Sequence, residues 1–146
     1  MKIAVACDHG GLSLKNVLME EMSKQGYEVV DFGTYNEESC DYPDYASKAA
    51  KAVASGECDK GVVVCGTGIG VSITANKVKG IRCALVHDVF SAKATRAHND
   101  TNMIAMGQRV IGEGLAVEIL NAWLNTDYEG GRHDQRIQKM MALEEE

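Results

Sequence analysis

A cysteine followed by closely spaced glycines is the feature of this sequence best suited to chemistry. Cys65 ends an apolar run, and Gly66, Gly68 and Gly70 follow it at alternate positions. A buried strand that passes through a glycine turn into a helix directs unpaired backbone N–H groups at one point, and such a point binds anions. A helix N-terminus also favours loss of the proton from a nearby thiol. The pattern therefore predicts an anion cradle, with Cys65 at its mouth as a base or a nucleophile.

A histidine in a polar run is a second candidate for proton transfer. His98 begins the run His98-Asn99-Asp100-Thr101-Asn102, between a predicted helix and the fifth predicted strand. A histidine suits a helix C-terminus, where its positive charge is favourable. It equally suits proton transfer from a loop at the carboxyl edge of a sheet. The sequence alone leaves both interpretations open.

Two arginines near the C-terminus are candidates for binding an anion. Arg132 and Arg136 lie four residues apart, so they share one face of a helix. This spacing fits a solvated basic surface, and Glu129 and Asp134 are close enough in sequence to neutralise it. It also fits a clamp for a phosphate or a carboxylate. Spacing does not decide between them.

The glycine turn also allows a nucleotide-binding interpretation. Asp88 lies about 20 residues beyond the glycines, where a ribose-binding acid follows a dinucleotide fingerprint. However, Val71 stands where that fingerprint has Gly or Ala. His87 and Asp88 suggest a metal pair, but no third ligand has suitable spacing, and Asp88 suits a helix N-cap. We expect no metal and no cofactor.

The composition is that of an ordinary soluble globular protein. The chain has 146 residues, of which 45% are hydrophobic and 25% charged, and its net charge is −6. This length suits a single domain over residues 1–146, and the negative charge argues against nucleic-acid and membrane partners. The five cysteines include no CxxC pair, which favours reduced thiols in the cytoplasm. No apolar run approaches the length of a membrane span.

Short apolar runs alternate with amphipathic stretches, which predicts an α/β protein with a parallel sheet covered by helices on both faces. The predicted strands are Lys2–Cys7, Glu28–Asp31, Lys60–Cys65, Arg82–Val86 and Asn102–Met106. The predicted helices are Leu12–Gln25, Pro43–Ser55, Gly70–Lys77, Val89–Ala97, Gly114–Asn125 and Arg132–Glu144. We expect a doubly wound, Rossmann-like five-stranded sheet in the order 2-1-3-4-5, with an extra C-terminal helix.

This topology predicts where the chemistry gathers. Ligands of such sheets bind beyond the carboxyl ends of the strands, where the strand order reverses. Here that point lies between the first strand, which leads into Asp8 and His9, and the third strand, which ends at Cys65. We expect these three side chains around one crevice.

Several segments, in order along nearly the whole chain, resemble the ribose-5-phosphate isomerase type B family of sugar-phosphate isomerases, which is shared with galactose-6-phosphate isomerase. They are Cys7-Asp8-His9-Gly10, Asp41-Tyr42-Pro43, Cys65-Gly66-Thr67-Gly68-Ile69-Gly70, Ala75-Asn76-Lys77, Gly80-Ile81-Arg82, His98-Asn99-Asp100-Thr101-Asn102 and Glu129-Gly130-Gly131-Arg132-His133.

The resemblance implies a metal-free interconversion of ribose 5-phosphate and ribulose 5-phosphate through a cis-enediol or enediolate, in the non-oxidative pentose phosphate pathway. Cys65 matches the base that moves a proton between C1 and C2. Thr67 and His98 match positions associated with opening the furanose ring. Substrate-binding roles fall to further positions: Asp8, His9, Gly66, Gly68, Ile69, Gly70, Asn99, Arg109, Arg132 and Arg136.

The resemblance also bears on assembly and substrate choice. It implies a homodimer or a tetramer (a dimer of dimers), with the site at a subunit interface. Some members use a glutamate of the following helix as the base, but Ser72–Thr74 contains no acid here, which favours the cysteine type. The alternative functions are isomerisation of a six-carbon sugar phosphate (allose 6-phosphate or galactose 6-phosphate) and, less favoured, nucleotide binding.

Overall fold

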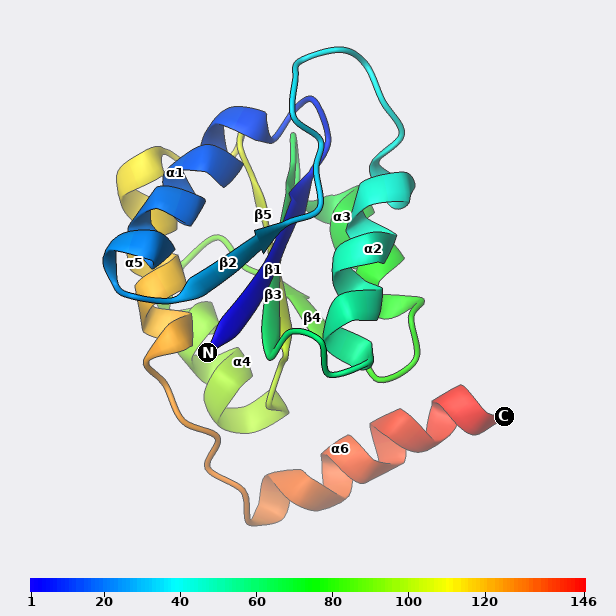
Figure 1. The fold of residues 1–146 in the computed structure, drawn as a ribbon. Coiled ribbons are helices and arrows are strands. Elements are labelled where there is room, and N and C mark those ends of the chain that lie inside the picture. Colours follow the sequence, from blue (N-terminus) through cyan, green and yellow to red (C-terminus); the bar gives the residue numbers. More distant parts are fainter.

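The computed structural model describes residues 1–146 and contains a five-stranded parallel sheet between two layers of helices (Figure 1). The strands are β1 (Lys2–Cys7), β2 (Glu28–Asp31), β3 (Lys60–Cys65), β4 (Cys83–Leu85) and β5 (Met103–Gly107). The helices are α1 (Leu12–Lys24), α2 (Tyr42–Ala54), α3 (Ile69–Asn76), α4 (Val89–Asn99), α5 (Glu113–Leu124) and α6 (Arg132–Ala142), followed by a 3-10 turn at Leu143–Glu145. Every predicted strand and helix is present, with bounds within two residues of those expected.

The doubly wound parallel sheet is confirmed, but the order of its last two strands was wrong in the prediction. The order is 2-1-3-5-4, because β5 lies between β3 and β4. Ile104 of β5 is in register with Val62 on one side and with Ala84 on the other. All five residues of β5 are buried, whereas the three-residue β4 is partly exposed. An inner strand is covered on both faces, so the longer apolar strand takes the inner position.

The two faces of the sheet carry different cores. Successive side chains of a strand point to opposite faces. On one face, Val62 and Val64 pack with large residues of α1 and α5, including Trp123. On the other face, Val63 and Cys65 pack against α2 and α3, where α2 contributes mainly alanines. The base candidate therefore lies in the layer of the molecule that is packed mainly with small residues.

The last helix, α6, lies beyond the two layers, below the end of the sheet at which β1 begins (Figure 1). His133 is its only buried residue. Near the C-terminus, the Glu144 carboxylate accepts the Gly80 N–H at 3.0 Å. The extra C-terminal helix is confirmed, and most of its surface has no partner within the chain.

None of the helices combines the length and the apolar character that crossing a membrane requires.

Candidate active site

The predicted glycine cradle is present at the end of β3. Gly68 has a φ of 78°, and α3 begins at the next residue. The Gly68 N–H donates to the Cys65 Sγ at 3.1 Å, and the Ile69 N–H donates to the Thr67 Oγ1 at 3.2 Å. A Cβ at Gly68 would lie 2.6 Å from Leu85 Cδ1, so both backbone conformation and space require glycine here.

Several N–H groups of the cradle have no acceptor in the chain. The N–H groups of Gly66, Thr67 and Gly70 donate no hydrogen bond to any backbone or side-chain atom, although they flank the buried thiol. Cys65 is only 6% exposed. Unpaired donors around one point form a site for an anion or for an oxygen that becomes negative during a reaction.

The loop after β1 meets the cradle, as predicted. β1 pairs with β3, and Cys7 is in register with Val64. Asp8 is 8% exposed, and its Oδ1 accepts the Gly10 N–H at 2.8 Å, which fixes the carboxylate. A hollow of about 450 Å³ opens above these loops. Its lining residues are Asp8, Tyr42, Cys65, Gly66, Thr67, Ile69, Gly70 and Ile73.

His9 and Arg109 add positive or hydrogen-bonding groups at the same edge of the sheet. Both residues are exposed. The Cys40 N–H donates to the His9 Nδ1 at 3.2 Å, so a neutral His9 carries its proton on Nε2. Arg109 donates its backbone N–H to the Gly66 carbonyl oxygen at 3.0 Å, which holds it next to the cradle. The Arg109 side chain also passes close to Gly66, although neither His9 nor Arg109 is among the residues that line the hollow.

Cys7 and Cys65 end neighbouring strands, yet their surroundings differ. Cys7 is 1% exposed, and burial raises the pKa of its thiol to about 12. Its Sγ faces the Thr34 carbonyl oxygen at 3.9 Å, whereas the Cys65 Sγ accepts an N–H. Cys7 is therefore a residue of the core.

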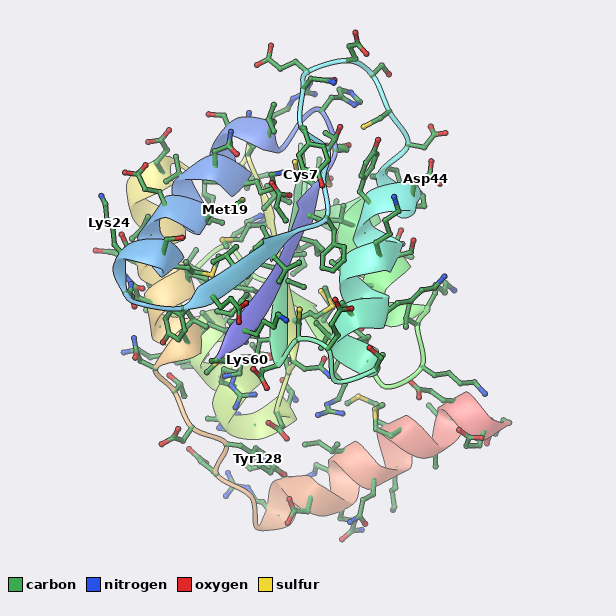
Figure 2. All side chains as sticks on the ribbon, viewed as in Figure 1. Cys7, Met19, Lys24, Asp44, Lys60 and Tyr128 are labelled. Atoms are coloured by element: carbon green, nitrogen blue, oxygen red, sulfur yellow. The ribbon has the colours of Figure 1, made fainter.

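Of the two interpretations left open for His98, the structure has the helix C-terminus and not a loop at the carboxyl edge. His98 belongs to the last turn of α4, which leads into the amino end of β5. Because the strands are parallel, His98 and Asn99 lie at the edge opposite Cys65. A strand of this length separates its two ends by roughly 17–20 Å. Figure 2 shows the two edges, with Cys7 at one end and Tyr128, the residue before Glu129, at the other.

Three ionisable side chains gather at the amino edge. The rings of His98 and His133 stack with centroids 4.5 Å apart. Glu129 Oε1 lies 3.9 Å from His98 Nε2 and 3.6 Å from His133 Nε2. The His133 Nε2 is buried and has no hydrogen-bond partner. The ligand atoms of these three side chains lie close enough together to hold a metal ion.

The two predicted anion-binding arginines lie beside this cluster on α6. Arg132 and Arg136 are exposed, and neither forms a hydrogen bond or an ion pair within the chain. Glu129 faces the histidines instead, and Asp134 accepts a hydrogen bond from the Tyr128 hydroxyl. The acids that were candidates for neutralising the arginines are therefore engaged elsewhere, which leaves both guanidinium groups free for an anion.

The pair His87 and Asp88 proves to be structural. Both Asp88 carboxylate oxygens accept hydrogen bonds from Ser91, at 2.6 and 2.9 Å, which lowers the pKa of Asp88 and caps α4. His87 Nε2 accepts the Gly107 N–H at 2.9 Å. Asp88 is thus not free to bind a ribose, and the nucleotide-binding alternative loses its acid.

Sequence reasoning missed two kinds of site residue. Tyr42 and Ile73 line the hollow but were given no role, because only the fold brings α2 beside the cradle. Tyr42 precedes Pro43 at a helix start, and that local signal explains its position without revealing its neighbour. His133 was also without a role, and Glu129 was considered only as a partner of the arginines, because the segment between α5 and α6 has no periodic pattern that predicts its path.

The ribose/galactose isomerase family model matches residues 3–140. A putative sugar phosphate isomerase of Bacillus subtilis is 58% identical over 99% of this chain and 98% of its own. Ribose-5-phosphate isomerase B of Escherichia coli is 50% identical, with 99% and 97% covered.

Solved structures agree with this similarity. Ribose-5-phosphate isomerase B of Clostridium thermocellum superposes with a TM-score of 0.98 at 50% identity, covering 99% of this chain and 98% of that one. The enzyme of Mycoplasma genitalium with bound ribulose-5-phosphate has a TM-score of 0.95 at 37% identity, with 99% and 97% covered. The family model, the related sequences and the solved structures agree with one another. This chain therefore belongs to the ribose/galactose isomerase family.

Proposed function

We propose that this protein is an aldose–ketose isomerase that interconverts D-ribose 5-phosphate and D-ribulose 5-phosphate. The observation that carries the proposal is the nearly buried Cys65 thiol, held by the Gly68 N–H and surrounded by unpaired backbone donors. The α3 segment Ser72–Thr74 offers no acid that would replace the thiol as the base. The relatives named ribose-5-phosphate isomerase B supply the substrate in this proposal.

In the proposed mechanism, Cys65 acts as the base that moves one proton between two carbons. Its thiolate removes the proton from C2 of the open-chain aldose, and the C1 carbonyl oxygen takes up the negative charge. The thiol then returns the proton to C1, while the proton of the C2 hydroxyl moves to O1. The Gly66, Thr67 and Gly70 N–H groups stabilise the enediolate oxygen, because they have no partner in the chain and are fixed beside the thiol before the reaction begins. Isomerisation in this scheme needs neither metal nor cofactor.

We propose further that each site is built from two copies of the chain, in a homodimer or a dimer of dimers. His98 and Thr67 would open the furanose ring. The sugar hydroxyls would be oriented by Asn99 and Asp8. The phosphate would be held by the arginines and His9. The residues assigned to one reaction divide between opposite edges of the sheet, so one copy supports a complete site only if a second copy supplies its amino edge. Exposed apolar side chains flank the cradle and suit an interface: Ile69, Ile73, Leu85 and Phe90.

The chain acts as a single domain in the cytoplasm, within the non-oxidative pentose phosphate pathway. Isomerisation of allose 6-phosphate or galactose 6-phosphate is the second candidate. It is favoured by the relative named galactose-6-phosphate isomerase subunit, which is 42% identical over 95% of this chain.

The first experiment measures turnover of purified, chelator-treated protein on ribose 5-phosphate, with allose 6-phosphate and galactose 6-phosphate in parallel. We expect ribulose 5-phosphate as the main product and loss of activity in Cys65→Ala. Faster turnover of a six-carbon substrate would select the second candidate. No turnover on any of the three would contradict the isomerase proposal.

A second experiment tests the two-chain site by mixing two inactive variants. In a mixed dimer of Cys65→Ala and His98→Asn, one site carries both substitutions and the other carries neither. Random mixing is expected to restore about a quarter of the wild-type activity, because half of the dimers are mixed and each has one intact site. If the site were built within one chain, mixing would restore nothing.

A further inference from the structure

We propose that His98, Glu129 and His133 form a binding site for a divalent transition-metal ion of the zinc class, and that its occupation inhibits the enzyme. The three side chains come from α4, from the segment before α6 and from α6. Their ligand atoms all lie within 4.8 Å of one another. This site is distinct from the base and from the cradle, which occupy the opposite edge of the sheet.

The distances between the ligand atoms are close to those of a tetrahedral site. Zinc binds imidazole nitrogen and carboxylate oxygen at about 2.0–2.2 Å, which places neighbouring ligand atoms roughly 3.3 Å apart. Glu129 Oε1 already lies 3.6 Å from His133 Nε2 and 3.9 Å from His98 Nε2. Shifts of a few tenths of an ångström, and a turn of the exposed His98 ring out of its stack, bring the three atoms around one ion.

The buried nitrogen of His133 points to a ligand. The His133 side chain is 8% exposed, and its Nε2 is buried without any hydrogen-bond partner. An unsatisfied buried polar atom typically costs about 1–3 kcal/mol, so such an atom marks a place where a partner is missing. The nitrogen faces the Glu129 carboxylate, whose charge would balance a bound cation. A divalent ion between them supplies the missing partner.

The position of Glu129 does not depend on the metal. Its backbone N–H donates to the Ala97 carbonyl oxygen at 3.0 Å, next to His98 on α4. The His133 N–H donates to the Gly130 carbonyl oxygen, which returns the chain toward Glu129.

Two imidazoles with one carboxylate suit zinc, copper, nickel and cobalt, whereas magnesium and calcium prefer all-oxygen sites.

Occupation of the site would remove His98 from proton transfer. A metal takes the imidazole lone pair that an acid–base step requires, so it blocks ring opening without touching the thiol. This consequence rests on the proposed function, whereas binding of the metal does not. Inhibition should be stronger with the furanose substrate than with an open-chain analogue, because only the furanose needs His98 in that step.

Binding is tested with Co²⁺, whose visible absorption reports coordination by the protein. The full-length protein, Glu129→Gln and Glu118→Gln are titrated with Co²⁺. The last variant is the matched control, because Glu118 lies exposed on α5 and forms no ion pair. We expect Glu129→Gln to weaken binding at least about tenfold and the control to leave it unchanged. Equal affinity of all three proteins would overturn the proposal.

The thiol is the competing metal ligand, and Cys65→Ala separates the two sites. We expect this variant to bind Co²⁺ as the wild type does, without sulfur-to-metal charge-transfer bands. Loss of the absorption in Cys65→Ala would assign the metal to the cradle and overturn the proposal.

Inhibition is measured with Zn²⁺ against the uninhibited rate of each protein. Glu129→Gln should require at least about tenfold more Zn²⁺ for half-inhibition than the wild type or Glu118→Gln. Unequal Co²⁺ binding with equal Zn²⁺ inhibition would overturn the inhibitory role. A protein that binds Co²⁺ at this site but turns over no sugar phosphate would contradict the proposed function and leave the metal site standing.

Discussion

The two edges of the sheet place their functional groups in opposite ways. At the carboxyl edge, Cys65 and Asp8 are nearly buried, and backbone N–H groups fix both side chains. At the amino edge, Arg132 and Arg136 stand exposed on α6 without any partner in the chain. The first edge is set by strand ends and tight turns, and the second by side chains on the surface of helices.

This difference corresponds to what each edge would have to do. A base that removes a proton from carbon must be held in reacting distance and direction, since a misplacement of about 1 Å can cost 10²-fold in rate. A phosphate has three equivalent oxygens and tolerates more than one geometry, so flexible arginines are sufficient to hold it. We therefore expect changes at the carboxyl edge to affect turnover and stability, and changes at the amino edge to affect substrate binding.

The largest expected effect is that of Cys65→Ala. Removal of the base should lower kcat about 10²- to 10⁴-fold, because general acid–base catalysis contributes that much, and it should also lower Tm, because Cys65 packs in the core. Steady-state kinetics and thermal unfolding measure the two effects. The control is Cys7→Ala, at the end of the neighbouring strand, which should lower Tm and retain activity because Cys7 serves the core. Equal loss of activity in both variants would contradict the distinction between the two thiols.

The next effect is that of Gly68→Ala, which tests whether the cradle depends on backbone geometry. The φ of 78° and the approach to Leu85 should make the substitution cost about 1–3 kcal/mol in the free energy of unfolding and displace the N–H that meets Cys65. The free energy of unfolding, measured by chemical denaturation, and kcat should therefore fall together. Gly26→Ala is the control, since Gly26 has a φ of 89° with nothing within 4 Å of an added Cβ. The Gly26→Ala variant should have a lower free energy of unfolding and an unchanged kcat.

At the amino edge, Arg136→Ala should separate binding from stability. Loss of a charged hydrogen bond to phosphate, worth about 1.5–3 kcal/mol, should raise KM roughly 10- to 100-fold with Tm unchanged. Lys51→Ala removes a positive charge from the exposed surface of α2 and serves as the control. A fall in kcat at unchanged KM would remove Arg136 from phosphate binding and weaken the contrast between the edges.

The sequence predicted the carboxyl edge better than the amino edge for a physical reason. The cradle is local, because the strand end, the glycines and the helix start fall within residues 60–76, and its partner Asp8 follows from one rule of parallel sheets. The inner position of β5 depends on which strand is buried on both faces, and short apolar runs do not reveal that. For His98 the sequence left two interpretations open, although the run of α4 into the amino end of β5 was the signal that separates them.

The stacking of His98 on His133 could not be predicted from the sequence, for a different reason. It depends on the path of residues 125–131, which form no helix or strand and carry no hydrophobic period. The free state of the arginines was equally hidden, because it follows from Glu129 and Asp134 having other partners. Contacts made by irregular segments and by surface side chains have no repeating pattern, so the structure was needed to find them.

The smallest expected effect concerns His87, which follows β4 and holds the carboxyl end of β5 by a hydrogen bond to Gly107. Burial holds the pKa of His87 below its usual value of 6.5, and its Nε2 accepts the Gly107 N–H, which a protonated ring is unable to do. The unfolded chain takes up this proton near pH 6.5, and the folded protein only at lower pH. The stability contribution is therefore complete above about pH 6.5 and is lost as the pH falls toward the lower folded pKa, at no more than about 1.4 kcal/mol per pH unit.

Denaturant unfolding at pH 7.5 and pH 5.5 measures this loss in the wild type and in His87→Gln, which keeps an acceptor for the Gly107 N–H but does not titrate. The wild type should lose more stability than the variant over this interval. Because His87 holds the strand next to β3 rather than any substrate, KM should change little at either pH in His87→Gln. An identical pH dependence of stability in the two proteins would show that this hydrogen bond does not help to hold the rigid edge, and its rigidity would then rest on the glycine turns alone.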